Sequence, residues 1–286
     1  MNRRSLTILA VLVLTVYAAY SLVAVQPQTR KLAVSSQHPA SSAASERVFT
    51  APEPELVRSG LSLRAAAVRN AVDYRSALQE LSARSLDWDI ARVTAHQEVR
   101  SACALVHQPD SASPRVDMDP NRRPWLDRLQ QRCAGLPPDA LAPLPYDDPA
   151  QQAWIAQVPE LVAAQHGRSA ALRHSDELLR HSVDTRLLHE ALRYALVEGQ
   201  LPLEQIFTGA SPPVNADVEL ALVNAADWIG CERSGSCGTQ GLWTLYTCAQ
   251  FGCPAGSDLP TALQRITPPW QYEITRAIAM WALRGR

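Results

Sequence analysis

Four histidines recur at near-helical spacing and are the residues of this chain best suited to metal chemistry. Intervals of eight, seven and eight residues separate His166, His174, His181 and His189. At about 100° per residue, one continuous helix would hold all four side chains within a sector of about 140°, and neutral imidazole is a common metal ligand. Gly167 and residues 182–184 are expected to interrupt that helix, and arginines are interleaved. The pattern therefore favours surface histidines over a metal site; if a metal binds, its candidate ligands are His174, His181 and His189.

No local motif for catalysis is complete. His189-Glu190 begins like the zinc motif His-Glu-x-x-His, but Arg193 replaces the second histidine. Asp117 to Asn121 begins like a calcium loop, but arginines stand where its glycine and its bidentate glutamate belong. The sequence contains no nucleophile elbow, phosphate loop or dinucleotide fingerprint. We therefore assign no catalytic residue and expect no cofactor.

Paired carboxylates are the remaining candidates for acid–base chemistry. The closest pairs are Asp87 with Asp89 and Asp147 with Asp148. Both pairs lie in segments predicted to be irregular, where adjacent side chains rarely face one another, so helix capping or solvation explains them better than proton transfer.

The chain has an even number of cysteines. They are Cys103, Cys133, Cys231, Cys237, Cys248 and Cys253. Neither close pair has the Cys-x-x-Cys spacing of zinc knuckles or of thioredoxin-type redox sites, so structural disulfides in an oxidising compartment are favoured. The expected pairs are Cys103–Cys133, Cys231–Cys237 and Cys248–Cys253, and the first, which closes the longest loop, should contribute ~3 kcal/mol. Exchanged pairing among the last four cysteines, which would staple helix to helix, stays open.

The cysteine-rich region near the C-terminus resembles a module seen elsewhere. The residues that carry the resemblance are Trp228-Ile229-Gly230-Cys231, Gly235-Ser236-Cys237-Gly238, Cys248-Ala249-Gln250-Phe251-Gly252-Cys253 and the Pro-x-x-Tyr from Pro269 to Tyr272. They are similar to a C-terminal module of uncharacterised exported proteins of Gram-negative bacteria, some of which carry tetratricopeptide-like helical hairpins. The resemblance covers the C-terminal region only. It implies helices and disulfides, and it implies no activity.

The N-terminus carries an apolar segment long enough to cross a membrane. Residues 5–25 read SLTILAVLVLTVYAAYSLVAV, 21 residues without a charge, and a helix of about 20 residues spans the roughly 30 Å hydrocarbon core. Arg3 and Arg4 precede the segment and favour a cytoplasmic N-terminus. We expect a single-pass signal-anchor in a bacterial inner membrane, with the body in the periplasm. A signal peptide cleaved after Ala18, which would leave a secreted or periplasmic protein, is the alternative.

Composition favours a helical body. Alanine, leucine and arginine are abundant, glycine is scarce, and β-branched runs are short. The net charge of −1 indicates no general attraction to nucleic acid. Positive charge is almost entirely arginine, whose planar fork suits semi-buried ion pairs.

Before the body, three parts are expected. Residues 1–4 are a cytoplasmic N-terminus, residues 5–25 the transmembrane signal-anchor, and residues 26–54, rich in Ser, Ala, Pro and Gln, a disordered tether.

The body itself should divide into two helical subdomains. Helical periodicity runs from 55 to 106 with a break at 85–89, and a short helix follows at 124–133. Five prolines in 135–149 mark a boundary between an N-terminal subdomain, 55–135, and a C-terminal helical-hairpin subdomain, 150–286.

Helices beyond that boundary are predicted in pairs. A helix over 150–165 comes first, followed by 169–181 with 184–199, 215–229 with 239–250, and 258–266 with 268–284. Asp184 is the expected N-cap of the helix over 184–199. Comparable intervals between pairs are typical of hairpins packed as a short irregular α-solenoid or bundle. The expected fold class is all-α.

These features together predict a membrane-anchored periplasmic protein that interacts with, or scaffolds, another envelope protein. Its expected partners are the lipid bilayer, through residues 5–25, and an envelope protein, with no nucleic acid. Two alternatives stay open: an envelope hydrolase whose active site is assembled from distant residues, and a metal-binding protein that uses the histidine series. Convergent His, Asp or Glu side chains would favour the hydrolase.

Overall fold

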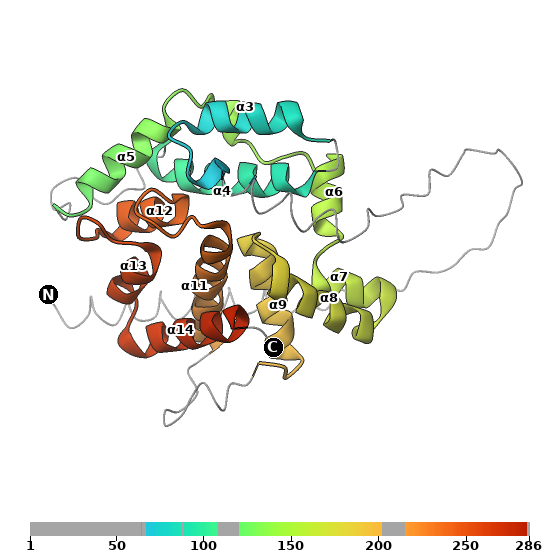
Figure 1. The fold of residues 1–286 in the computed structure, drawn as a ribbon. Helices are drawn as coiled ribbons and strands as arrows, with labels where there is room; N and C mark the ends of the chain where they lie inside the picture. The colour runs from blue at the N-terminus through green and yellow to red at the C-terminus, as the bar shows by residue number, and fades with distance from the viewer. Residues whose placement is uncertain (1–63, 65–66, 87–88, 108–119, 202–214, 285–286) are drawn as a thin grey trace, which may run out of the picture. The chain divides into compact units, whose positions relative to one another are not determined.

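The computed structural model describes residues 64, 67–86, 89–107, 120–201 and 215–284. Every regular element in these ranges is a helix (Figure 1), so the body is all-α as the composition predicts. The helices are α3 (Tyr74–Arg84), α4 (Ile90–His107), α5 (Arg123–Cys133), the 3-10 helix η1 (Pro138–Leu141), α6 (Pro149–Ile155), α7 (Pro159–His166), α8 (Arg168–His181), α9 (Thr185–Val197), α11 (Asn215–Ser234), α12 (Leu242–Phe251), α13 (Leu259–Ile266) and α14 (Pro269–Leu283).

The anchor and tether expected at residues 5–25 and 26–54 lie outside the described residues. Within the ranges that the structure does describe, no helix is both long and apolar enough to span a bilayer.

Aspartate residues cap five of the described helices. Asp73 precedes α3, Asp89 precedes α4, Asp148 precedes α6, Asp184 precedes α9 and Asp258 precedes α13, and each carboxylate accepts a backbone N–H of the following turn. A carboxylate at this position satisfies a donor that has no partner within the helix and interacts favourably with the helix dipole. The N-cap expected at Asp184 is confirmed, because its Oδ1 accepts two backbone N–H groups at 2.9 Å.

The helix that would align the four histidines is divided into three. Gly167, with φ of 83°, ends α7 and precedes α8, and this left-handed conformation is one that glycine adopts at little cost. Residues 182–184 separate α8 from α9. The single helix expected over 150–165 is also two helices, since Pro159 begins α7, and proline is well suited to a first turn.

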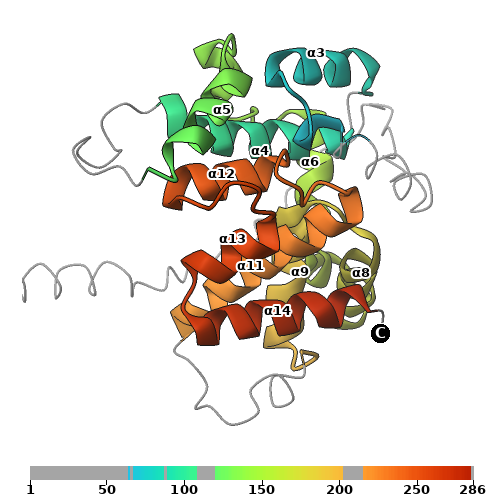
Figure 2. The same ribbon diagram turned by 60° about the vertical axis from the view of Figure 1, so that its left-hand side comes forward.

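Most of the helices pack in two clusters. The α12 cluster consists of α3, α4, α5 and α12, and the α11 cluster consists of α8, α9, α11 and α14 (Figures 1 and 2). In the α12 cluster, Tyr74, Trp125 and Leu129 pack in one core with Leu242 and Leu245 of α12. The segments 55–135 and 150–286, which we expected to form separate subdomains, therefore share this core.

Consecutive helices of the C-terminal half are not all neighbours in space. The expected hairpin of α8 with α9 is present. The next expected hairpin differs, because α11 packs mainly on α9 and α14, whereas α12 packs on α5, α13 and α4 (Figure 2). Helix α13 contacts both clusters, with Leu259 and Leu263 in the core of one and Ala262 in the core of the other. The described helices therefore form an interleaved bundle.

Candidate functional site

Arg69 lies buried where the two clusters meet. Its guanidinium donates two hydrogen bonds to the carboxylate of Glu98, at 2.8 and 2.6 Å. The other three go to Ser234 Oγ at 2.9 Å and to the carbonyl oxygens of Gly230 and Val183 at 3.0 and 2.6 Å. All five N–H groups of the side chain are thus used. Because every donor is paired, the charge can be held at only 1% exposure.

The partner carboxylate is as deeply buried as the arginine. Glu98 is 3% exposed, and burial raises its pKa although the charge of Arg69 acts in the opposite direction. Burial alone lowers the pKa of Arg69, but the charge and hydrogen bonds of Glu98, together with two nearby aspartates, raise it overall. The charge of Arg69 and its two hydrogen bonds to Glu98 thus oppose the effect of burial on the carboxyl, as a buried pair requires.

Asp184 is a second buried carboxylate near Arg69. Besides capping α9, it accepts hydrogen bonds from Thr94 Oγ1 of α4 and from Trp154 Nε1 of α6, the latter at 2.7 Å. The carboxylate thus accepts four hydrogen bonds, two from the backbone of α9 and one each from α4 and α6. Asp184 therefore fixes α4, α6 and α9 together and has little capacity left for chemistry.

Asp227, on α11, is the least constrained acid of this region. Its side chain is partly buried, and burial together with the charge of Glu98 raises its pKa to about 7, against the opposing effects of Arg69 and a hydrogen bond with Thr185. A carboxylic acid that titrates near neutral pH can exchange protons there.

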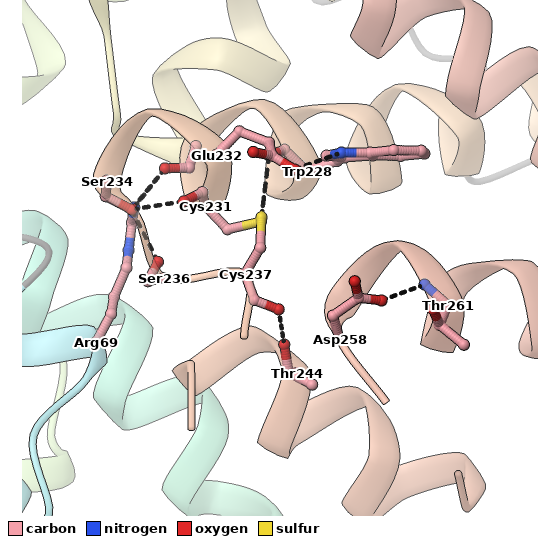
Figure 3. Close-up of a disulfide and its surroundings, with 11 residues drawn as sticks. Arg69, Trp228, Cys231, Glu232, Ser234, Ser236, Cys237, Thr244, Asp258 and Thr261 are labelled. Carbon is pink, nitrogen blue, oxygen red and sulfur yellow. Dashed lines mark hydrogen bonds between the residues drawn. A yellow bond between two sulfur atoms is a disulfide. The ribbon is translucent and has the colours of Figure 1, made fainter. Parts of the chain in front are cut away.

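Two serines near Arg69 belong to a turn closed by a disulfide. Cys231, on α11, is bonded to Cys237, six residues later. The segment between them contains Ser234, the last residue of α11, and Ser236 in the turn that follows (Figure 3). The two serine hydroxyls lie 2.8 Å apart, and Ser236 donates its backbone N–H to the carbonyl oxygen of Cys231 at 2.8 Å. The disulfide therefore closes the segment that contains Ser234, whose hydroxyl accepts a hydrogen bond from Arg69.

The other two disulfides lie inside the α12 cluster. Cys103–Cys133 links α4 to α5, and Cys248–Cys253 links α12 to the segment that follows it. All six cysteines are thus paired, and the pairs are those expected from the sequence.

The histidines of the candidate metal series are not brought together. His166 ends α7, His174 and His181 lie on α8, and His189 lies on α9. His174 Nε2 is 2.8 Å from the carbonyl oxygen of Gln157, and His189 Nε2 is 2.8 Å from Glu219 Oε1. Among the described residues, no group of three or more His, Cys, Asp or Glu side chains could hold a metal ion.

The remaining candidates from the sequence have structural positions or lie outside the described residues. Arg193, which replaces the second histidine of the incomplete zinc motif, pairs with Glu190 and Glu160 at 2.8 Å each. Asp148 caps α6 and pairs with Arg92 at 2.8 Å. The calcium-like segment 117–119 and residue 87 are not described.

Arg69, Glu98 and Asp227 were not among the residues singled out from the sequence. Arg69 and Asp227 carry no local signal, since their neighbours in the network are far away along the chain. Glu98 did carry one: Ala95, Val99 and Ala102 share its helix face and are buried, and a glutamate in such an apolar stripe implies a buried cation. The abundance of arginine had suggested pairs of this kind without saying which residues form them.

Comparisons of this chain with protein-family models, with curated proteins and with solved structures found no match. The functional argument therefore depends on the residues of the chain itself.

Proposed function

We propose that this chain is a membrane-anchored protein of the bacterial envelope, whose helical body lies in the periplasm and binds another envelope protein. The observation that carries the proposal is the pairing of all six cysteines in three intramolecular disulfides. Disulfides of this kind form and persist in oxidising compartments and are rare where thiols are kept reduced.

The apolar segment at residues 5–25 supports the same location independently. It is long enough to cross a bilayer, and Arg3 and Arg4 before it favour a cytoplasmic N-terminus and an exported body. In this proposal, residues 26–54 are the tether that separates the membrane from the helical bundle.

Binding is favoured over catalysis because most of the converging polar groups are already engaged. Arg69 uses all of its donors, and Asp184 holds three helices together. By contrast, the aromatic ring of Trp270, at the start of α14, is presented to solvent with 43% of the residue exposed. Tryptophan is strongly enriched among the residues that dominate protein–protein binding.

Thiol labelling in cells tests the location. Cells expressing the full chain are quenched in acid, denatured, and treated with a mass-tagged maleimide with or without prior reduction. We expect at least Cys103, Cys133, Cys248 and Cys253 to stay unlabelled before reduction and all six cysteines to be labelled after it. The matched control is a variant without residues 1–25, which should stay in the cytoplasm and be labelled directly. Labelling of all six thiols in the unreduced full chain would overturn the proposed location.

Cross-linking in intact envelopes tests the binding function. The full chain and its Trp270→Ala variant are cross-linked, solubilised in mild detergent and purified under identical conditions. We expect one envelope protein in stoichiometric amounts with the full chain and a lower yield with W270A, whose far-UV circular dichroism should be unchanged. Absence of any stoichiometric protein partner across growth conditions would count against an interaction module.

An envelope hydrolase is a second candidate, favoured by Asp227 alone. A partly exposed carboxylic acid whose pKa is about 7 is suited to general acid or base catalysis. Purified peptidoglycan, as a representative envelope polymer, should then be cleaved by the full chain and not by the Asp227→Asn variant. Equal release of soluble fragments by the two proteins would remove this candidate. The histidine series has no comparable support, since His174 and His189 contact different partners.

A further inference from the structure

The turn between Cys231 and Cys237 is a connection point for several helices. Ser234 in the turn accepts a hydrogen bond from Arg69, which also binds Glu98 of α4. Arg233, the residue before, donates to carbonyl oxygens at the end of α8 and in α14, including that of Ser182 at 2.8 Å. The α11 end of the turn is thus linked by polar contacts to both clusters.

The other end of the turn is linked to α12 and α13. The carbonyl oxygen of Cys237 accepts a hydrogen bond from Thr244 Oγ1 of α12 at 3.0 Å (Figure 3). It accepts another from the backbone N–H of Leu259, the first residue of α13, at 2.9 Å. The disulfide therefore joins Cys237, which is hydrogen-bonded to α12 and α13, to Cys231 in α11. Helices α11 and α12 have their main packing partners elsewhere, so this covalent link adds to the few contacts that connect them, such as the packing of Trp243 of α12 against the core of the α11 cluster.

Cys237 also differs from the other cysteines in its accessibility. It is partly exposed, whereas each of the other five cysteines is at most 1% exposed. Thiol–disulfide exchange requires a thiolate to reach one sulfur of the bond, so access limits the rate. Among the three disulfides, Cys231–Cys237 is the one that includes a partly exposed cysteine.

We propose that Cys231–Cys237 is an exchangeable disulfide, reduced by an exported protein dithiol, and that its opening loosens the junction between the α11 and α12 clusters. A thiolate of the dithiol attacks Sγ of Cys237, the Cys231–Cys237 bond breaks, and Cys231 leaves as a thiolate and takes up a proton. The second thiol of the reductant, once deprotonated, attacks the mixed disulfide and releases Cys237, which is also protonated. The protein gains two electrons and two protons, and the reductant becomes a disulfide.

The physiological form of this reaction rests on the proposed location, but the chemistry can be tested without it. The full chain is purified oxidised in mild detergent and incubated with dithiothreitol, a small dithiol, for increasing times. Samples are quenched in acid, alkylated and analysed by peptide mass spectrometry to give a rate for each disulfide.

Cys248–Cys253 is the matched control, because its sequence separation is 5 against 6 and both of its sulfurs are buried. We expect Cys231–Cys237 to be reduced roughly tenfold faster, since it alone includes a cysteine that is partly exposed. Reduction of Cys248–Cys253 at an equal or higher rate would overturn the proposal, and it would leave the cellular labelling result for the location unaffected.

Hydrogen exchange then tests the structural consequence. In the singly reduced and alkylated protein, or in the Cys231→Ser, Cys237→Ser double variant, amide exchange should accelerate at the start of α13, where Leu259 donates to Cys237. Residues 159–166 of α7, which make none of the contacts described at the junction, should exchange as in the oxidised protein. Unchanged exchange at Leu259 after selective reduction would show that the disulfide does not hold the junction and would overturn the second half of the proposal.

Discussion

Replacing Arg69 with methionine should destabilise the body by about 3–5 kcal/mol, which is the usual cost of removing one partner from a buried ion pair. Methionine retains much of the volume of the arginine stem, so the change removes the charge and the donors with little loss of packing. The substitution therefore isolates the electrostatic contribution of the guanidinium.

The magnitude follows from what the change leaves behind. Glu98 is 3% exposed, and of its described hydrogen bonds only the long one from Thr185, at 3.4 Å, remains. The carbonyl oxygen of Val183 also loses the donor contributed by Arg69, and a buried polar group left without a partner costs about 1–3 kcal/mol. Burial already raises the pKa of Glu98, so the carboxylate can take up a proton once Arg69 is gone. This protonation sets an upper limit to the free energy of unfolding that is lost.

Urea unfolding of the full chain in mild detergent, followed by far-UV circular dichroism, gives the free energy of unfolding of each variant. The double variant R69M/E98M removes both charges, so it should be less destabilised than the sum of the single variants by about 2 kcal/mol. Arg193 supplies the matched control, because its pairs with Glu160 and Glu190 are at the surface, and R193M should lose at most about 1 kcal/mol.

Two results would refute this reasoning. If R69M lost no more stability than R193M, the Glu98 carboxylate would not depend on Arg69 for its burial. If the effects of R69M and E98M were additive, the two residues would stabilise the fold through separate contacts and not as a pair.

Three further perturbations follow from the same structure. Asp227 has a native pKa of about 7 against its usual 3.8, so the native state binds more protons between those values. Stability should fall as pH rises through that window, by at most about 4 kcal/mol, and urea titrations should show D227N nearly independent of pH there. Gly230→Ala should destabilise by about 1–3 kcal/mol, because its Cβ would lie 2.9 Å from a backbone oxygen, whereas Gly238→Ala, with nothing within 4 Å, should be nearly neutral in the same assay. Removing Cys103–Cys133, which spans 30 residues, should lower the thermal midpoint, with a loss of about 3–4 kcal/mol by loop-closure entropy.

The sequence predicts the local structure of this chain well, because caps and turns are decided by neighbouring residues. Asp184 was expected to cap a helix and does. Gly167 was expected to interrupt the histidine series and adopts a positive φ. The three cysteine pairs are also those expected, although the sequence alone left exchanged pairing among the last four cysteines open.

Which helices pack together could not be predicted in the same way. The spacing of α11 and α12 along the chain is that of a hairpin, but α12 buries Leu242 and Leu245 against helices that precede it by more than a hundred residues. A hydrophobic stripe predicts that a helix face is buried, but it does not identify the elements that cover that face. The boundary suggested by the prolines in 135–149 is real as a break in regular structure, although core residues on both sides of it pack together.

The buried hydrogen-bond network around Arg69 was even harder to predict from the sequence. Arg69 and Ser234 are 165 residues apart, and neither has a sequence context that points to the other. Glu98 could have been suspected, since a buried carboxylate needs a cation, but the choice among so many arginines depends on tertiary structure alone.

Polar contacts of this kind constrain the junction of the two clusters differently from apolar packing. An apolar interface tolerates small shifts because dispersion and burial change gradually with distance, whereas the five donors of Arg69 lose their partners once geometry fails. Ser234 is the last residue of α11, so the helix itself places the hydroxyl that accepts from Arg69. The disulfide adds a covalent link from α11 to Cys237, whose carbonyl oxygen accepts the backbone N–H of Leu259. The ion pair and the disulfide thus act on one junction, and opening Cys231–Cys237 should be felt first at Leu259, where α13 begins.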